Sequence, residues 1–190
     1  YNLHIASCKN EINIIISSKF PNKKIYFLTY GDNNYKNSKN RLYNEAINSN
    51  FFTDCFKLGP DNLNHDFKDK FKDVLKLKKG AGYWIWKPYI IYNKLLELNN
   101  NDFLIYMDAG CKINLNGKKR YIKYLKMLED SNEGIISFET THKEKYFTNK
   151  YLLDFLNVDI NSKMADSNQL VGGILILKKN ENKIKIFSET

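Results

Sequence analysis

GAGYWIWKPYIIYNKLLELNNNDFLIYMDAGC, residues 80–111, carries the clearest structural pattern in the sequence. It predicts an aromatic loop flanked by glycines, then a helix that begins near Pro88, then a buried strand at 103–107. Proline is tolerated in a first helical turn because its missing N–H would be unpaired there anyway. The run FLIYM is almost wholly apolar, which is typical of a strand covered on both faces in an α/β sheet. Asp108 follows at once, at the end of a strand where open α/β sheets bind ligands.

The rest of the chain alternates between strand and helix patterns. Strands are predicted at 24–30, 51–58, 134–139 and 170–177, and either a short strand or the end of an earlier element at 12–16. The first predicted helix follows an N-cap at Ser38 and has Leu42, Ala46 and Ile47 inward, and the second spans 62–79 with its lysines in solvent. The third begins near Pro88 and has its apolar side chains inward: Ile90, Ile91, Leu95, Leu96 and Leu98. Two more helices are predicted at 118–129 and at 151–156. Polar loops are expected at 140–145 and 161–168, and an unfinished helix at 178–190. Such alternation favours an α/β fold with a Rossmann-type, mainly parallel sheet flanked by helices, and the length favours one domain over 1–190.

Composition narrows the class of protein. Hydrophobic residues make up 43% of the chain, which excludes a disordered polymer. The net charge of +9 permits an anionic partner, but the lysines are scattered and no docking motif is present, so a solvated basic surface is favoured over nucleic-acid binding. No apolar run approaches the ~20 residues of a membrane span. Three cysteines without CxxC spacing suit a reducing compartment, and the expected location is cytoplasmic, either free or peripheral to a membrane.

The turn Asp108-Ala109-Gly110 is the first candidate site. A hard cation such as Mn²⁺ or Mg²⁺ takes one or two carboxylates together with the oxygens of a bound phosphate, and an aspartate at a strand end suits that task. Small Ala109 and Gly110 allow a bulky ligand to approach the backbone. The alternative is that Asp108 only caps the turn.

The aromatic loop supplies the second candidate. Lys87 precedes a helix start, where backbone N–H groups already favour an anion, and it would add a point charge to a diphosphate. Tyr83 and Trp86 are candidates for stacking on a base or sugar. The alternative is that the aromatic side chains are core anchors, which is the favoured role for at least one tryptophan.

Two further segments carry polar residues beside predicted strands. Tyr30, Gly31 and Asp32 end the first strand, where a nucleotide lies in a Rossmann-type half, and Arg41 suits bidentate phosphate contacts or pairing with a nearby carboxylate. The second segment contributes Asp166 and Gln169, which are expected to face a sugar, before Gly172 and Gly173. Glycines within an apolar strand mark either a close ligand approach or tight packing.

Together these residues resemble a glycosyltransferase of the GT-A fold, in the bacterial and viral group with a GxGYWxWKP segment and a DAG turn. The specific likeness covers residues 80–88 and 106–111, and a looser likeness extends from about 24 to 179. It implies a nucleotide-sugar donor (a UDP- or GDP-sugar), a glycan or lipid-linked acceptor, and Asp108 in the place of the first aspartate of the DxD motif, with Mn²⁺ or Mg²⁺. Gly110 stands where DxD has its second aspartate. The likeness also implies that a C-terminal part of the site follows residue 190.

The residues implied for the site fall into three roles. Asp166 and Gln169 are implied as catalytic, and Asp108 as the metal ligand. The donor-binding set is Tyr30, Gly31, Asp32, Arg41, Tyr83, Trp86, Lys87, Ala109, Gly110, Gly172 and Gly173. The competing function class is a GT-A domain that binds a nucleotide-sugar or glycan without turning it over, and a basic nucleic-acid-binding protein ranks last.

Overall fold

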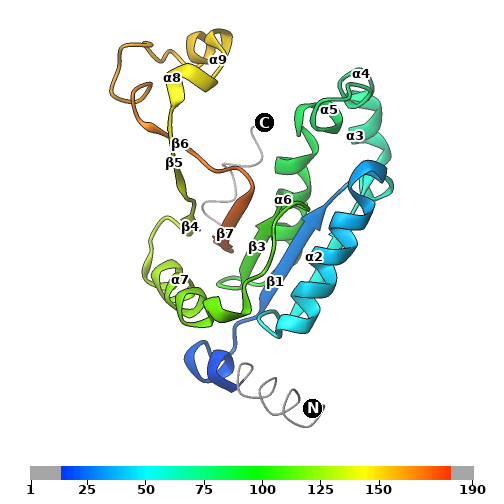
Figure 1. The fold of residues 1–190 in the computed structure, drawn as a ribbon, viewed down its shortest axis with the longest axis vertical. Coiled ribbons are helices and arrows are strands. Elements are labelled where there is room, and N and C mark those ends of the chain that lie inside the picture. Colours follow the sequence, from blue (N-terminus) through cyan, green and yellow to red (C-terminus); the bar gives the residue numbers. More distant parts are fainter. Residues whose placement is uncertain (1–13, 181–190) are drawn as a thin grey trace. The chain divides into compact units, whose positions relative to one another are not determined.

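The computed structural model describes residues 14–180, which form two compact units. Unit 2 comprises residues 137–174, and unit 1 contains the described residues on either side of it (Figure 1). The single domain over residues 1–190 stays a prediction. No helix in the range 14–180 has both the length and the apolar character needed to cross a bilayer.

Unit 1 is built on a mixed five-stranded sheet with the strand order β2-β1-β3-β7-β4. The strands are β1 (Ile25–Tyr30), β2 (Asp54–Leu58), β3 (Phe103–Met107), β4 (Ile135–Ile136) and β7 (Ile174–Lys178). β1 pairs in parallel with both β2 and β3, whereas β4 is antiparallel to β7. The coarse prediction of an α/β fold with a largely parallel core is therefore confirmed (Figure 1).

Two long helices cover opposite faces of this sheet, because successive strand residues point to opposite sides. Leu28 of β1 and Leu104 of β3 pack with α6 (Trp86–Glu97), whose buried residues include Ile90, Ile91 and Leu95. Phe27 of β1 packs on the other face with Leu42 and Ala46 of α2 (Lys36–Ser49). The predicted strand at 103–107 is confirmed, and its first four residues are buried.

Several predicted boundaries in unit 1 are wrong. α2 begins at Lys36, so Ser38 lies inside the helix; Asp32 instead caps the short η1 (Asn33–Tyr35) that leads into it. The start of α6 is confirmed instead, since the helix begins at Trp86 and Pro88 lies in its first turn. The strand alternative at 12–16 is wrong because residues 14–19 are helical; residues 12–13 lie outside the described residues. Ile47 and Leu96, both predicted inward, are exposed.

The predicted helix at 62–79 is also wrong, because the segment divides into shorter pieces. These are η2 (Pro60–Asn62), α3 (His65–Lys70) and α4 (Lys72–Leu75). Asn64 caps α3 by accepting from Phe67 N–H, and Phe71 leaves the helical conformation at φ −112° and ψ 19°. The chain therefore does not continue as one straight helix. η3 (Leu115–Gly117) and α7 (Lys118–Asp130) follow β3 as predicted, with Leu125 and Leu128 of α7 buried.

Unit 2 contains a two-stranded antiparallel sheet and two short helices. They are β5 (Glu139–Lys143), α8 (Glu144–Phe147), α9 (Lys150–Phe155) and β6 (Asn168–Leu170). The predicted strand at 134–139 is divided between β4 and β5, the loop at 140–145 is mostly strand and helix, and the loop at 161–168 reaches β6 only at its last residue. The strand predicted at 170–177 is interrupted by a turn at residues 172–173, so β7 begins at Ile174. The helix at 151–156 is confirmed within a residue, and the helix predicted at 178–190 lies almost entirely outside the described residues.

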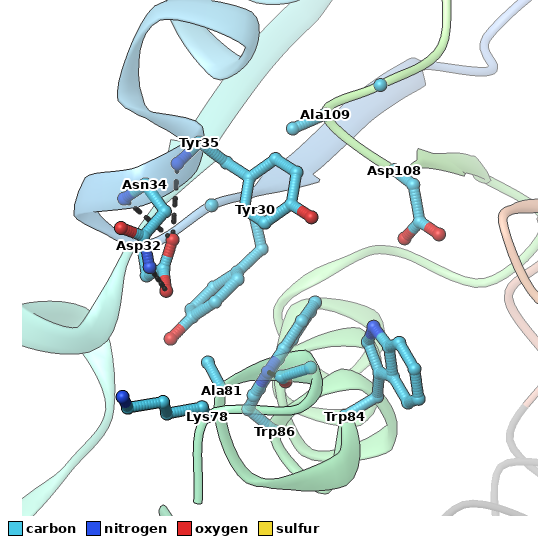
Figure 2. Close-up of a pocket in the computed structure, with 13 residues that line it drawn as sticks. Tyr30, Asp32, Asn34, Tyr35, Lys78, Ala81, Trp84, Trp86, Asp108 and Ala109 are labelled. Carbon is cyan, nitrogen blue, oxygen red and sulfur yellow. Dashed lines mark hydrogen bonds between the residues drawn. The ribbon is translucent and has the colours of Figure 1, made fainter. Parts of the chain in front are cut away.

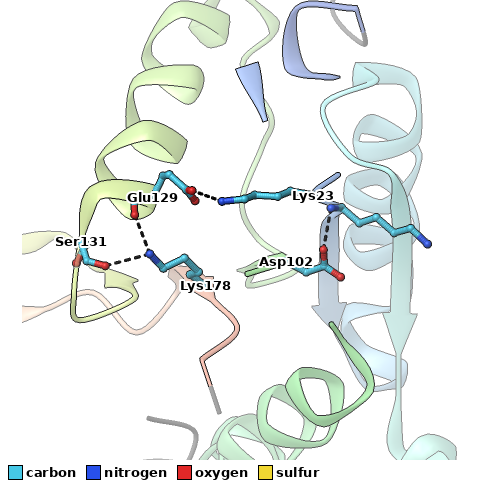
Figure 3. Close-up of polar contacts among 6 residues, drawn as sticks. Lys23, Asp102, Glu129, Ser131 and Lys178 are labelled. Carbon is cyan, nitrogen blue, oxygen red and sulfur yellow. Dashed lines mark hydrogen bonds and ion pairs between the residues drawn. The ribbon is translucent and has the colours of Figure 1, made fainter. Parts of the chain in front are cut away.

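Charged side chains form hydrogen bonds and ion pairs at the end of the sheet where β1 and β3 begin (Figure 3). Asp102, only 2% exposed, accepts from the Lys24 and Asn99 N–H groups at 2.9 and 3.2 Å. Glu129 of α7 pairs with Lys23, and Lys178 donates to the carbonyl oxygens of Glu129 and Ser131. These contacts satisfy polar groups at the end of the sheet where β1 and β3 begin. The opposite end, where β1 and β3 finish, is the one considered for a ligand.

Candidate functional site

A cavity of about 680 Å³ lies in unit 1 at the carboxyl ends of β1 and β3 (Figure 2). Its walls come from the segment after β1, from the turn after β3 and from the aromatic loop before α6. The lining residues are Tyr30, Gly31, Asp32, Asn34, Tyr35, Lys78, Gly80, Ala81, Trp84, Trp86, Asp108, Ala109 and Gly110. A cavity of this volume accommodates a ligand of nucleotide size. Seven residues predicted for the site line it together: Tyr30, Gly31, Asp32, Trp86, Asp108, Ala109 and Gly110.

The aromatic loop forms a single left-handed turn, α5 (Gly80–Tyr83). Five successive residues, 80–84, have positive φ angles between 49° and 94°. The turn is closed by hydrogen bonds from Tyr83 N–H to Lys79 O at 2.7 Å and from Trp84 N–H to Gly80 O at 3.1 Å. A left-handed conformation costs an L-residue about 1–2 kcal/mol. The surrounding contacts therefore offset a substantial strain at this wall of the cavity.

Glycine is favoured at both positions of this turn by the backbone conformation and by the lack of room for a Cβ atom. Gly80 has φ +61°, and an added Cβ would lie 2.5 Å from the Trp84 indole. Gly82 has φ +94°, and a Cβ there would lie 3.0 Å from Leu75 Cα and Val74 O. The indole of Trp84 therefore rests against the Gly80 backbone, while its ring stays 44% exposed at the cavity.

A stacked pair of rings forms the floor between the strands and α6. Tyr30 and Trp86 lie 3.8 Å apart between ring centroids at an interplanar angle of 20°, and each is about 5% exposed or less. The Trp86 indole N–H donates to Gly80 O at 3.0 Å. Trp86 is thus a core anchor that fixes the left-handed turn. Burial, helped by Asp32 and Asp61, raises the pKa of Tyr30 to about 12, so its hydroxyl stays protonated at neutral pH.

Asp108 is brought to α6 by the alternation of β3. Tyr106 and Asp108 lie on the same side of the chain, and Lys87 Nζ is 2.9 Å from Asp108 Oδ1 and 3.2 Å from Oδ2. The Tyr106 hydroxyl donates to Asp108 Oδ1. Burial, followed by the charge of Asp108, holds the pKa of Tyr106 far above its usual range, so this donor keeps its proton. Asp108 still exposes 38% of its side chain to the cavity, whereas Lys87 exposes 15% and does not line it.

Arg41 and Glu45 of α2 hold the turn that follows Asp108. Arg41 Nη1 pairs with Glu45 Oε1 at 2.7 Å, and Nη2 donates to Ala109 O at 3.2 Å and to Cys111 O at 2.8 Å. Glu45 Oε2 accepts from Ile113 N–H at 3.0 Å. Burial alone would raise the pKa of Glu45, but the bonds from Ile113 and Arg41 outweigh it and lower that pKa. Arg41 therefore acts outside the cavity, where it positions the Asp108 turn.

We expect Arg41→Ala to lower the free energy of unfolding by about 1–2 kcal/mol, because charge-assisted hydrogen bonds are lost while the site is a third exposed. Arg41→Lys should recover less than half of this loss, since one ammonium group cannot replace the guanidinium fork. Urea unfolding monitored by circular dichroism measures both. Arg120→Ala, at an exposed position of α7, is the matched control. Equal stability of Arg41→Ala and Arg120→Ala would show that Arg41 does not hold the turn after Asp108.

The other end of the cavity carries Asp32, Asn34 and Lys78 (Figure 2). Asp32 accepts from the Asn34 and Tyr35 N–H groups at 3.0 and 3.2 Å, which fixes the segment after β1. Lys78 lies just before the left-handed turn and points to the same end of the cavity as Asp32. Sequence reasoning missed it because a continuous helix at 62–79 would have left its lysines in solvent. The place of Lys78 two residues before the glycine-rich turn that begins at Gly80 was the available signal.

Tyr83 and the predicted residues of unit 2 have surroundings of their own. Tyr83 is 55% exposed beside the cavity without lining it. Asp166, Gln169, Gly172 and Gly173 belong to unit 2. There Asp166 accepts from Lys145 Nζ at 2.9 Å and lies 3.9 Å from Lys143 Nζ, and these lysines lower its pKa. Gln169 is a partly buried residue of β6, and the two glycines form the turn before β7.

The described residues offer a divalent cation few protein ligands. Within 14–180, no group of three or more His, Cys, Asp or Glu side chains gathers at one point. Asp108 supplies one carboxylate, which it already shares with the ammonium group of Lys87. A Mg²⁺ or Mn²⁺ ion would therefore take its other ligands from phosphate oxygens and water, as such ions do at sites with one carboxylate.

Comparison with known proteins adds nothing to this geometry. No family model, curated protein or solved structure matches the chain.

Proposed function

We propose that this chain is a glycosyltransferase of the GT-A type, and that the cavity of unit 1 holds its nucleotide-sugar donor. One observation carries the proposal: Asp108 and Lys78 line opposite ends of one cavity whose walls are aromatic. A nucleotide-sugar has a flat base and a diphosphate, so it matches aromatic rings flanked by a cation and by a carboxylate that can hold a metal ion. The position at the carboxyl ends of parallel strands agrees with the ligand sites of open α/β sheets.

The proposed reaction moves a glycosyl group. The oxygen of an acceptor hydroxyl forms a bond to the anomeric carbon, while the bond from that carbon to the diphosphate breaks and its electron pair stays on the diphosphate. The hydroxyl proton passes to a base or to water. Lys78 would stabilise the growing negative charge directly. Lys87 would do so through Asp108, because its ammonium group holds that carboxylate at the cavity wall.

A divalent cation forms part of the proposal. Mn²⁺ or Mg²⁺ would be held by Asp108 together with the diphosphate, and when bound it would supply Lewis-acid stabilisation of the leaving group. Asp108 would hold that ion, Tyr106 and Lys87 orient Asp108, and Arg41 holds the turn behind it. The acceptor is proposed to be a glycan or a lipid-linked sugar.

The second candidate is a nucleotide-sugar-binding domain without turnover. The single carboxylate at the metal position favours it, since Gly110 offers no ligand where a second aspartate would stand. The two candidates share the cavity and differ only in chemistry. Release of UDP or GDP from a bound donor in the presence of acceptor separates them.

Tryptophan fluorescence tests donor binding directly, because both tryptophans of the chain, Trp84 and Trp86, line the cavity. We expect UDP- or GDP-sugars to quench it saturably, and added Mn²⁺ to tighten the binding. Lys78→Ala should weaken binding about tenfold or more, the usual effect of removing a charge-assisted hydrogen bond. Lys76→Ala is the matched control, since Lys76 pairs with Asp73 in solvent. No quenching by any nucleotide-sugar would contradict the proposal.

A further inference from the structure

A second concave site lies in unit 1 between α3 and α6. It is a groove of about 350 Å³ whose floor consists of aromatic side chains. Phe67 of α3 and Tyr89 of α6 stack at 4.1 Å between ring centroids and 29° between planes, and Phe71 lies 4.8 Å from Phe67. Tyr92 follows Tyr89 by nearly one helical turn on α6, so it extends the same wall.

Polar side chains surround this aromatic floor. Asn64, Asp66, Lys70 and Asn93 line the groove together with the rings. One carboxylate, one ammonium group and two amides give the rim no net charge, and they supply both donors and acceptors. The groove therefore suits a neutral ligand that has an apolar face and several hydroxyl groups.

We infer that this groove binds a saccharide. The C–H face of a pyranose ring is apolar and packs against aromatic rings, while its hydroxyl groups both donate to and accept from amide and carboxylate side chains. The volume of the groove is that of a small ligand site and accommodates one or two sugar rings. Saccharide binding is independent of the donor cavity; the identity of this saccharide as the acceptor rests on the proposed function.

The groove and the donor cavity share one short segment. Trp84 and Trp86 line the cavity, whereas Ile85 between them lines the groove together with Pro88 and Tyr89. The two sites therefore lie on either side of the strained turn and the start of α6. Both tryptophans line the donor cavity and neither lines the groove. Tryptophan fluorescence therefore reports ligand binding in the cavity, and a separate signal is needed for the groove.

Saturation-transfer NMR with the whole chain tests the inference, with maltose, lactose and N,N′-diacetylchitobiose as probes and glycerol as the negative control. We expect saturation transfer to ring protons of at least one disaccharide and none to glycerol. Tyr92→Ala and Asn93→Ala should each weaken the binding about fivefold, a typical loss for one ring contact or neutral hydrogen bond. Tyr151→Ala, at an 84% exposed tyrosine of unit 2, should leave it unchanged.

Circular dichroism and nucleotide quenching of tryptophan fluorescence show whether each variant is folded. Asn93→Ala removes a half-buried side chain outside the ring stack, so it keeps the test valid if Tyr92→Ala fails to fold. Absence of saturation transfer from all three disaccharides overturns the inference, as does transfer that Tyr92→Ala and Asn93→Ala leave intact. Disaccharide binding without nucleotide quenching supports the groove while the donor proposal fails, and the reverse result overturns the groove alone.

Discussion

Asp108→Asn should reduce glycosyl transfer by about 10²–10³-fold, the usual effect of losing one charge-stabilising group in an active site. Asparagine keeps the shape and an acceptor oxygen for the Tyr106 hydroxyl and the Lys87 ammonium. It removes the negative charge that a divalent cation requires and that balances Lys87. Release of UDP or GDP in the presence of an acceptor measures the change.

The fold should survive this substitution, because Asp108 is partly exposed and the asparagine oxygen can still accept from the Tyr106 hydroxyl, although the second bond from Lys87 is lost. The free energy of unfolding should change by less than about 1 kcal/mol. Asp130→Asn, at the exposed end of α7, is the matched control and should leave transfer unchanged. Transfer by Asp108→Asn within about twofold of the unaltered chain would exclude Asp108 from the chemistry.

Gly82→Ala should destabilise unit 1 by about 1–3 kcal/mol and abolish nucleotide quenching. Alanine is strained at φ +94°, and its Cβ would lie 3.0 Å from the backbone of Leu75 and Val74, which cannot move aside as a flexible side chain does. Gly80→Ala should act similarly, since its Cβ would displace the Trp84 indole. Urea unfolding and tryptophan fluorescence measure the two effects.

Gly117→Ala is the control for these glycine variants, because a Cβ there meets no atom within 4 Å and the residue lies away from the cavity. It should keep both stability and nucleotide binding. If Gly82→Ala were as stable as Gly117→Ala and bound nucleotide equally well, the left-handed turn would not shape the cavity.

The central part of the fold was predictable because its signals are local. The apolar run 103–107 is short, is nearly free of polar residues and is followed directly by Asp108, so periodicity and position sufficed to place a carboxylate at a strand end. The alternation of β3 then carries Tyr106 and Asp108 to the same face as α6. The pairing of Asp108 with Lys87 follows from that register and the start of the helix.

The left-handed turn was not predictable in the same way. Gly80 and Gly82 indicated a loop, but Ala81, Tyr83 and Trp84 also take positive φ angles, which their residue types disfavour. Tertiary contacts impose this conformation: the Trp86 indole bonds to Gly80 O, and Gly82 packs against the backbone of Leu75. The same turn points Lys78 into the cavity, so the cation was missed together with the conformation.

Arg41 illustrates a second limit of sequence reasoning. Its residue type suited a phosphate ligand and carboxylate pairing equally, and the choice depends on carbonyl groups 68 and 70 residues further along the chain. Only the packing of α2 against the end of β3 brings those groups within reach. The residues of unit 2 are a similar case, because Asp166 meets Lys145 and Lys143 through the pairing of β5 with β6.

A crystal structure of the chain with a UDP- or GDP-sugar and Mn²⁺ tests the central claim most directly. We expect a diphosphate in the cavity between Asp108 and Lys78, with the metal ion bound to the Asp108 carboxylate. A donor bound at another place on the chain, with this cavity empty, would contradict it.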